Sequence, residues 1–389
     1  MTSKPARRLL MKALFIAAIA AAIELLSRGG LSVLERRGVH YQPILGDRVS
    51  TKHRQAIEDL LRGRPSCFQL DAVLGWSLRP GFRSPECTVD AEGRRRAPDR
   101  PQPATNAVRL AAFGDSFTFG GDVVDRDAYP EALARLDERL DIANYGVPAY
   151  GLDQAFLRYL KERRAARSQV VIIGYMSENI CRHVSVFRPF YNPTTVFPLA
   201  KPRYLPGERG LSLFPNPLPT PEAYRRLLAH PAETLAELGR HDVYYHARPH
   251  AGPLDRSATV RLVKLAAAQL EPTTRDDCYA DGEAFQVTSR LFSDFYETAL
   301  RDGTQPVILI FPQRADLAGW RSDRRKSYTP LLRSLAGKGY RVVDAMAAFD
   351  EAGRERSIDE LVPGHLSPLA NMLVAEHLRR RLQSFGLIR

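Results

Sequence analysis

The chain has few residues of the kinds that dominate disulfide-rich, metal-binding or multi-span proteins. It holds 4 Cys, 5 Met and 2 Trp in 389 residues. No two cysteines form a CxxC pair, so a zinc or thioredoxin-like site has no support. Beyond the N-terminus there is no long apolar run, which excludes a multi-span membrane protein, and there is no internal repeat. With 44% hydrophobic and 26% charged residues, the composition is that of a packed globular protein, and the length allows two units or one large α/β domain with insertions.

Basic residues exceed acidic ones, 56 Lys+Arg against 44 Asp+Glu, for a net charge of +12. The arginines are spread along the chain, and the densest runs, 94–96 and 379–381, are short and not interleaved with aromatic or glycine-rich elements. We interpret the excess as a solvated basic surface and expect no nucleic-acid partner. Attraction to anionic lipid or acidic polysaccharide is the alternative.

The first 30 residues have the pattern of a targeting segment. Basic residues precede the uncharged run Ala13–Ile23, which is the order of a basic n-region and an apolar h-region. This run is short for a bilayer span of about 20 residues, and the longer stretch Leu9–Leu26 includes Lys12 and Glu24. A cleaved signal peptide and an uncleaved signal anchor both fit, and we favour the anchor. Either one places the remainder outside the cytoplasm, in the periplasm or at the cell surface.

The four cysteines are Cys67, Cys87, Cys181 and Cys278. Four cysteines allow three pairings, of which Cys67 with Cys87 closes the shortest loop. A disulfide there would stabilise the fold by about 3 kcal/mol in the chain-entropy model. Four buried thiols are the alternative.

Residues 31–105 are broken by Pro and Gly, and we expect a lead-in segment with short strands and no core of its own. From Val108 onward short apolar runs alternate with helical patterns. This alternation predicts a parallel sheet with helices on both faces. The expected strands are 108–113, 142–145, 170–173, 307–311 and 341–343, and the expected helices are 129–140, 154–167, 283–301, 331–335 and 369–382.

Residues 185–282 interrupt this rhythm. We expect a hairpin over 203–213 with Pro206-Gly207 at its turn, followed by helices over 221–238 and 259–270. Insertions after the carboxyl ends of strands usually shape the ligand site. The aromatic string Phe187–Tyr191 at its start is either core or a platform on which a sugar ring stacks.

The first expected strand runs into Phe113–Gly120, FGDSFTFG. A Gly after a buried strand permits a tight turn, and the Ser that follows would present its hydroxyl at the carboxyl edge of the sheet, as a nucleophile requires. Asp115 is expected to fix this turn. Because Asp and Ser are also preferred helix caps, Ser116 as a simple cap is the alternative.

This segment resembles the first block of the SGNH/GDSL hydrolase superfamily, Gly-Asp-Ser-hydrophobic. The resemblance covers roughly residues 106–182 and 283–384. It implies an α/β fold with a flavodoxin-like three-layer parallel sheet, in a hydrolase unit over 106–389 that carries the insertion 185–282. It also implies an ester-bond hydrolase with Ser116 as nucleophile, similar to membrane-anchored bacterial esterases and acyltransferases.

The resemblance extends to the groups that would stabilise an oxyanion. The family's second block matches Asn144–Gly151, NYGVPAYG, and gives the donor role to Gly146. The third block, Gly-x-Asn-Asp, is looser here, and within Gly174–Asn179 the best match is Asn179. The resemblance thus implies an oxyanion hole made of the Ser116 N–H, the Gly146 N–H and the Asn179 amide, each donor contributing about 3–4 kcal/mol.

The last family block matches Val362–Pro368, and His365 would be the general base. The family usually has an Asp three residues before this His, where this chain has Val362. The orienting carboxylate is therefore Asp359 or Glu360 on the same loop, Asp344 after the fifth strand, or absent, and we favour Asp359. A Ser–His dyad without a carboxylate would still work, less strongly.

His241, His246 and His250 have loosely metal-like spacing, but no nearby carboxylate or Cys completes a set, so we expect no metal and no cofactor. The sequence therefore predicts an exported, membrane-anchored serine esterase acting on acylated carbohydrate or another small ester, with O-acetyl esters of envelope or extracellular glycans as the class that the resemblance implies. An O-acyltransferase using the same residues is one alternative. A catalytically silent envelope binding or assembly protein is the other, and no oligomeric state follows from the sequence.

Overall fold

The computed structural model describes residues 4–100, 102–208, 210–268, 278–280, 282–353 and 355–389. At its centre is a five-stranded parallel sheet with the strand order β4-β3-β5-β8-β9. This is the order of a flavodoxin-like sheet, in which the first strand lies between the second and the third, so the predicted fold class is confirmed. The strands are β3 (Val108–Gly114), β4 (Leu140–Gly146), β5 (Val170–Met176), β8 (Gln305–Phe311) and β9 (Val342–Asp344).

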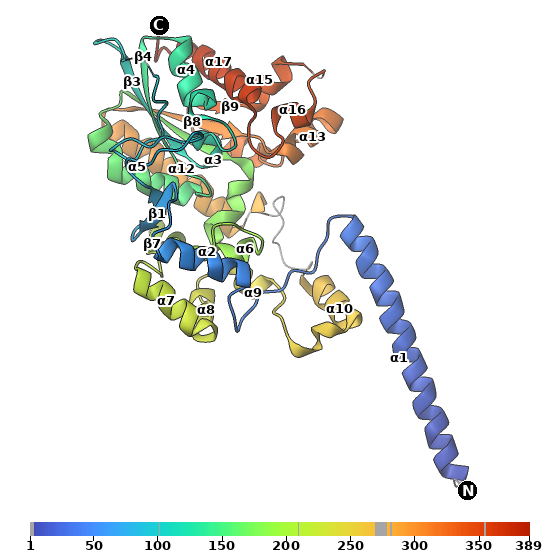
Figure 1. The fold of residues 1–389 in the computed structure, drawn as a ribbon. Helices are drawn as coiled ribbons and strands as arrows, with labels where there is room; N and C mark the ends of the chain where they lie inside the picture. Colours follow the sequence, from blue (N-terminus) through green and yellow to red (C-terminus); the bar gives the residue numbers. More distant parts are fainter. Residues whose placement is uncertain (1–3, 101, 209, 269–277, 281, 354) are drawn as a thin grey trace.

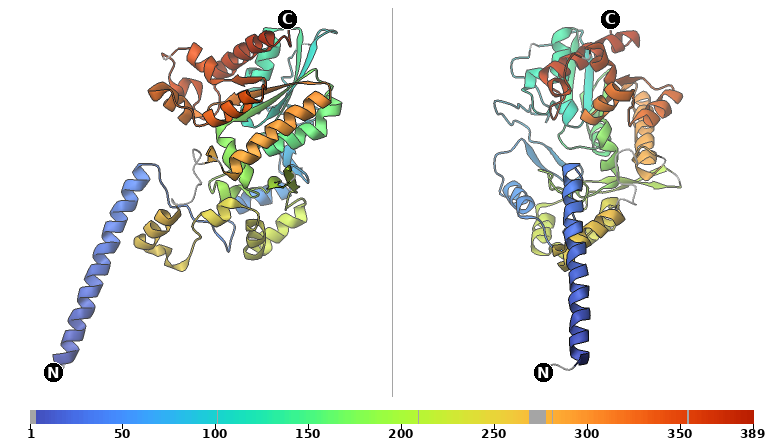
Figure 2. Two further views of the ribbon diagram at one scale, coloured as in Figure 1. Left: turned by 180° about the vertical axis from the view of Figure 1, so that it is seen from behind. Right: turned by 90° about the vertical axis from the view of Figure 1, so that its right-hand side faces the viewer.

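Helices cover both faces of this sheet (Figures 1 and 2). Alternate residues of each strand enter opposite cores: on β3, Leu110 and Ala112 face one core, and Ala111 and Phe113 face the other. Burial on both faces is why these strands read as continuous apolar runs. One face packs against α5 (Leu152–Ala166), α12 (Glu283–Arg301) and α14 (Thr329–Gly337), and the other against α4 (Tyr129–Leu136), α13 (Arg314–Asp323), α15 (Met346–Glu351) and α17 (Pro368–Ser384).

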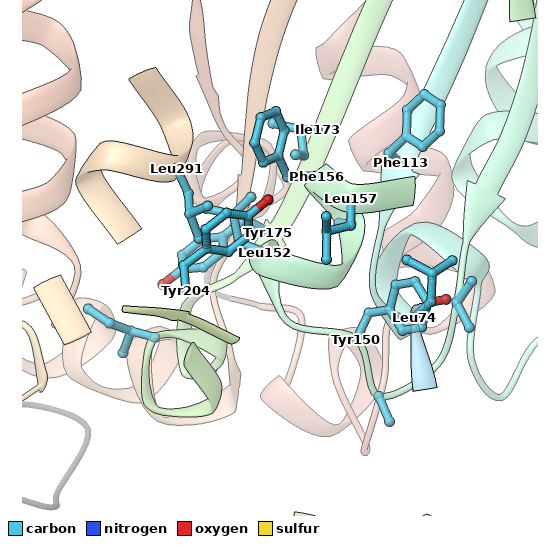
Figure 3. Packing of buried hydrophobic residues seen from close by; sticks show 14 of the residues in the cluster. Leu74, Phe113, Tyr150, Leu152, Phe156, Leu157, Ile173, Tyr175, Tyr204 and Leu291 are labelled. Carbon is cyan, nitrogen blue, oxygen red and sulfur yellow. The ribbon is translucent and has the colours of Figure 1, made fainter. Parts of the chain in front are cut away.

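The larger core extends from the sheet into the rest of the chain. Figure 3 shows that side chains of β3, β5, α5 and α12 meet there with residues of the insertion and the lead-in. Trp76 and Ile57 of the lead-in belong to this same core. The lead-in contains α2 (Thr51–Leu61) and the antiparallel strands β1 (Phe68–Asp71) and β2 (Gly75–Leu78).

The lead-in also protects an edge of the sheet. An isolated bridge joins Arg95 to Asn144 on the edge strand β4, which leaves less of that edge free to pair with another chain. Arg95 is buried, at 2% exposure. The prediction that its basic run is solvated is therefore wrong at this residue, because its guanidinium pairs with Asp125 and donates to buried backbone carbonyls.

The insertion consists of short elements against one end of the sheet domain (Figure 1). Phe187 and Phe190 are each only 2% exposed, so the core alternative holds for these two rings of the aromatic string. They also line a cavity of about 210 Å³ between the insertion and the lead-in, which Ser116 does not line. The elements are α6 (Arg188–Tyr191), β6 (Arg203–Gly207), β7 (Gly210–Phe214), α7 (Pro221–Ala229), α8 (Pro231–Gly239), α9 (Val243–Ala247), η3 (Pro253–Arg256) and α10 (Ala258–Ala268).

Besides shifts of one to three residues at element ends, three expected features differ from the structure. The helix over 221–238 is two helices, because Pro231 has no N–H and forces His230 out of the helical region (φ −127°, ψ 62°). In the hairpin, Pro206 and Gly207 pair with β7, so they end a strand and do not form the turn. The helix over 129–140 stops at Leu136 because Asp137 is extended. Residues 269 and 270 of the last insertion helix lie outside the described residues.

The N-terminal helix α1 (Lys4–Arg36) extends away from the remainder of the molecule (Figure 2). Its stretch Arg7–Arg36 is long and apolar enough to cross a membrane by length and composition, a test that a signal sequence also passes. The carboxylate of Glu24 accepts hydrogen bonds from the backbone N–H groups of Ala258 (2.6 Å) and Thr259 (3.1 Å). The first turn of α10 is therefore attached to α1 just after the apolar run.

Candidate active site

Ser116 lies where β3 turns into the short helix α3 (Ser116–Phe119). The turn is tight because Thr118 sits over two glycines: a Cβ on either Gly114 or Gly174 would collide with the Thr118 hydroxyl. The sequence motif therefore needs glycine at the end of β3 and again in β5. Ser116 is 7% exposed, and in the described part of the chain its side chain and its backbone N–H have no hydrogen-bond partner.

Asp115 fixes the turn, as expected from its type. Its buried carboxylate accepts hydrogen bonds from the backbone N–H groups of Phe117 (2.7 Å) and Met176 (3.0 Å) and from the amide of Asn179. Burial raises the pKa of the Asp115 carboxyl, against the lowering effect of the nearby Arg182 charge and of these donors. A single carboxylate thus attaches the nucleophile's turn to the end of β5.

Asn179 is brought beside Ser116 by this contact. It lies on the 3₁₀ helix η2 (Ser177–Val184), which follows β5, and it is 1% exposed. One hydrogen of its Nδ2 goes to Asp115, and its Oδ1 is buried without a hydrogen-bond partner. The second Nδ2 hydrogen is the one that could reach a substrate oxygen.

Gly146 lies at the end of β4, but its backbone N–H is not open to a substrate. Its backbone N–H donates to Oδ1 of Asn144 at 2.9 Å, so the proposed oxyanion donor is already engaged. A Cβ at this position would collide with the backbone of Thr118 and Phe119. Glycine is therefore needed here because α3 lies directly against the end of β4.

The loop after β4 offers another backbone donor, at Ala149. The N–H groups of Val147, Tyr150 and Gly151 are all hydrogen-bonded, and Pro148 has none. Within the described residues the N–H of Ala149 has no partner. Ala149 also has a positive φ of 68°, a conformation that costs a non-glycine residue energy and that clusters at functional sites.

Three side chains hold the carbonyl groups of this loop. The indole N–H of Trp76 donates to the Pro148 carbonyl at 2.9 Å. Arg188 donates to the Ala149 carbonyl and Arg182 to the Tyr150 carbonyl, each at 2.8 Å. Because the C=O and N–H of a trans peptide point in opposite directions, Trp76 sets where the Ala149 N–H points.

His365 lies on the loop between α16 (Ile358–Leu361) and α17 and packs beside the nucleophile's helix. Its ring centroid is 5.7 Å from that of Phe117, the residue after Ser116. A Cβ on Gly121 would lie 2.9 Å from the His365 ring, so this glycine gives the ring room. The structure therefore brings Ser116 and His365 to the same edge of the sheet, although no hydrogen bond joins them among the described residues.

The carboxylate at His365 is that of Asp122. Its Oδ2 lies 2.6 Å from Nδ1 of the ring, which leaves Nε2 for the nucleophile. Asp122 has a φ of 63°; Asp tolerates this region better than most residues. Sequence reasoning missed Asp122 because it sits six residues after the nucleophile and not before the His. The signal that could have found it is Gly120-Gly121-Asp122, a turn directly after the motif.

The predicted partner Asp359 points elsewhere. Its exposed carboxylate pairs with Arg314, which lowers the pKa of that carboxyl. The two alternatives are also engaged: Glu360 accepts from the Ser357 N–H at 2.6 Å, and Asp344 pairs with Lys326 at 2.6 Å. Asp122 therefore replaces Asp359 as the carboxylate beside His365, because the acidic residues on the loop before His365 have other partners.

Arg95 supports the turn that carries Asp122. Its guanidinium donates to the carbonyls of Phe119, Gly120 and Val123 and pairs with Asp125 at 2.6 Å. The buried cation thereby satisfies carbonyl groups on both sides of Gly121 and Asp122. A residue of the lead-in thus positions the loop on which His365 rests.

In the part of the chain that the structure describes, no group of three or more His, Cys, Asp or Glu side chains could hold a metal ion. His241 stacks on Phe214 with ring centroids 4.1 Å apart. Nε2 of His250 lies 2.7 Å from the Tyr245 carbonyl. The ring of His246 lies edge-on to that of Tyr245, with centroids 5.6 Å apart. All three spaced histidines thus have other contacts.

No protein-family model matches the chain, and no curated protein matches it. Among solved structures, it is similar to a lipolytic protein of the G-D-S-L family from Desulfitobacterium hafniense DCB-2, with 13% identity, 71% of this chain and 99% of that chain covered, and a TM-score of 0.36. It is also similar to a catalytic mutant of Axe2, an acetylxylan esterase from Geobacillus stearothermophilus, with 12% identity, 74% of this chain and 99% of that chain covered, and a TM-score of 0.37. A third similar structure is LAE5, an α/β hydrolase enzyme from the Lake Arreo metagenome, with 13% identity, 74% of this chain and 98% of that chain covered, and a TM-score of 0.39. These TM-scores are below 0.5 and the identities are low, so the roles of the residues in this chain follow from its own geometry.

Proposed function

We propose that the protein is an exported serine esterase that hydrolyses acyl esters, with O-acetyl esters of envelope or extracellular carbohydrate as its substrates. One observation carries the proposal. His365, paired with Asp122, packs on the residue next to Ser116, while Asn179 is attached through Asp115 to the other side of the same turn. A hydroxyl, an imidazole with a carboxylate and an amide donor at one sheet edge are the parts that acyl transfer needs.

In the first half of the reaction Ser116 Oγ attacks the ester carbonyl. Nε2 of His365 takes the hydroxyl proton, and the Asp122 carboxylate accepts the Nδ1 hydrogen, which fixes the tautomer and stabilises the imidazolium. When the tetrahedral intermediate collapses, His365 gives the proton to the leaving sugar hydroxyl, and the acyl group remains on Ser116. Water then repeats these steps and releases the carboxylic acid.

The negative charge on the carbonyl oxygen needs fixed donors. We assign these to the backbone N–H of Ser116, the side-chain amide of Asn179 and the backbone N–H of Ala149, in place of Gly146. The first and the last have no other partner in the described chain. Removing one such donor typically costs about 3–4 kcal/mol of transition-state stabilisation.

The apolar stretch of α1 fits the proposed location. Retained as an anchor, it would keep the enzyme at the outer face of the cytoplasmic membrane, because the basic residues before the apolar run stay inside. Substrate would then be polymer in the surrounding envelope space and not a cytoplasmic metabolite.

The test is hydrolysis of p-nitrophenyl acetate and of an O-acetylated oligosaccharide by the full-length protein in detergent. Ser116→Ala should lower turnover by about 10⁴-fold or more, whereas Ser293→Ala, a buried serine on α12 remote from the site, should leave it unchanged. Equal turnover by Ser116→Ala and the unaltered protein would show that the ester chemistry is not at this site. A gain of 42 Da by an oligosaccharide acceptor, the mass of an acetyl group replacing a hydrogen, would instead show transfer to sugar.

A further inference from the structure

The fold sorts the four cysteines into two close pairs. The sulfur atoms of Cys67 and Cys87 are 3.2 Å apart, and those of Cys181 and Cys278 are 2.9 Å apart. Both distances are shorter than the roughly 3.5–4.0 Å of ordinary packing contacts between heavy atoms. Of the three pairings that four cysteines allow, the tertiary structure favours this one alone.

We infer that the folded protein carries two disulfide bonds, Cys67–Cys87 and Cys181–Cys278, which hold in place the two segments that build the oxyanion donors. The bonds join residues 20 and 97 positions apart. Disulfides of this kind persist outside the cytoplasm, which agrees with the proposed export, but their formation does not depend on Ser116 being a nucleophile.

Each bond forms by thiol–disulfide exchange with an oxidant such as glutathione disulfide. The thiolate of one cysteine attacks a sulfur of the oxidant, forming a mixed disulfide and releasing one glutathione thiol. The second cysteine then attacks the protein-side sulfur and releases the second glutathione thiol. Two electrons and two protons pass from the cysteine pair to the oxidant. A hydrogen bond from Cys67, opposed by burial and aided by the Arg95 charge, lowers the pKa of Cys87, so Cys87 is the better first nucleophile.

The first pair closes the loop that contains Trp76. Trp76 is fully buried and holds the Pro148 carbonyl, and Tyr150 returns a hydrogen bond to the Trp76 carbonyl at 2.6 Å. On the other side of Cys87, the Thr88 N–H donates to Asp125 at 2.8 Å, within the network of Arg95. A bond at Cys87 therefore fixes both the support of the Ala149 peptide and the edge of the network that carries Asp122.

The second pair fixes the segment that carries Asn179. Cys181 lies two residues after it on η2, and the hydroxyl of Tyr279, next to Cys278, donates to the Ser177 carbonyl at 2.6 Å. Both sulfurs belong to buried residues, 4% and 6% exposed. The disulfide at Cys278 and the hydrogen bond from Tyr279 would thus both hold η2 in place.

The pairing is tested by mass spectrometry. Reduced full-length protein in detergent is incubated with a mixture of reduced and oxidised glutathione, blocked with iodoacetamide and digested without reductant. We expect two linked peptide pairs, 67 with 87 and 181 with 278, and no carbamidomethyl cysteine. Four alkylated thiols, or any other pairing, would overturn the inference. Because this measurement needs no substrate, its outcome is independent of the outcome of the esterase assay.

The consequence is tested with the double variants C67S/C87S and C181S/C278S. Each should melt about 5–10 °C below the oxidised protein. Reductant should lower the melting temperature of the unaltered protein but not that of a variant in which all four cysteines are replaced by serine. C181S/C278S should lower kcat for p-nitrophenyl acetate several-fold at nearly constant KM, since Asn179 acts on the transition state. A melting temperature of the unaltered protein that does not respond to reductant would contradict the inference.

Discussion

On the Ser116 side of the candidate site the polar side chains of Asp115, Ser116 and Asn179 are buried, whereas on the His365 side both groups face solvent. Asp115 and Asn179 are each 1% exposed, but the side chains of His365 and Asp122 are 33% and 69% exposed. A donor held in a dry, fixed environment stabilises charge strongly, while an exposed ion pair is weakened by water and salt. We therefore expect most of the proposed transition-state stabilisation to come from the buried side.

The largest effect, after loss of Ser116 itself, is expected at Asn179. Asn179→Ala should lower kcat/KM for p-nitrophenyl acetate by about 100–1,000-fold, because the oxyanion loses a preorganised donor. The matched control is Asn216→Ala, a buried asparagine in the insertion whose amide donates to the Leu218 carbonyl. It should lower the melting temperature comparably but leave kcat/KM near that of the unaltered protein. Equal activity losses in both would show that Asn179 acts only through stability.

A smaller effect is expected at Asp122. Asp122→Asn should lower kcat by about 10–100-fold, less than for a buried triad carboxylate, because water can partly replace an exposed partner. Asp359→Asn should change kcat by less than 2-fold, since its carboxylate pairs with Arg314. If steady-state assays show a larger loss of kcat for Asp359→Asn than for Asp122→Asn, then Asp359 and not Asp122 orients His365.

Trp76→Phe should lower kcat by about 3–10-fold with KM nearly unchanged. A smaller aromatic ring replaces the indole, and the Pro148 carbonyl loses the N–H that orients the Ala149 peptide. The control is Trp320→Phe, the other tryptophan, whose indole N–H has no hydrogen-bond partner in the described structure. A kcat loss of the same size in Trp320→Phe would exclude a specific role for the Trp76 hydrogen bond.

The buried side should also respond to acid, through its stability and not through its activity. His183, on η2, accepts the Leu152 N–H at Nε2 (3.0 Å), and burial lowers the pKa of this histidine to about 3. The unfolded chain binds a proton near pH 6.5, so stability should be fully present above this pH and fall by about 1.4 kcal/mol per pH unit below it. His183→Gln should flatten this dependence in urea unfolding measured from pH 4 to 7. An unchanged slope would assign the dependence to another group.

The fold could be predicted well because parallel strands buried on both faces leave a local signature. Each expected strand run lies within an observed strand or overlaps it, and the helix Glu283–Arg301 begins and ends where its pattern predicts. The errors came where a single residue overrides a pattern, as Pro231 does by ending one helix and starting the next. The division of the chain into anchor, lead-in and hydrolase unit stays a prediction.

The site could be predicted only in part. Ser116, His365 and Asn179 follow from strand ends and loop motifs, and the structure places them at one edge, although their roles stay proposals. Asp122 and Ala149 could not be found in this way, because what singles them out is a contact with a distant loop and an N–H left without a partner. Gly146 was assigned a donor role, but its N–H already donates to Oδ1 of Asn144.

By itself the sequence determined the succession of strands and helices along the chain, the turn at Ser116 and the apolar N-terminal segment, because each depends on the spacing of side chains along a short stretch. Only the tertiary structure decided which carboxylate meets His365, which backbone amide stays open and which cysteines meet. These pairings join residues far apart along the chain, and their geometry is set by how the lead-in and the loops pack on the sheet, which no local pattern encodes.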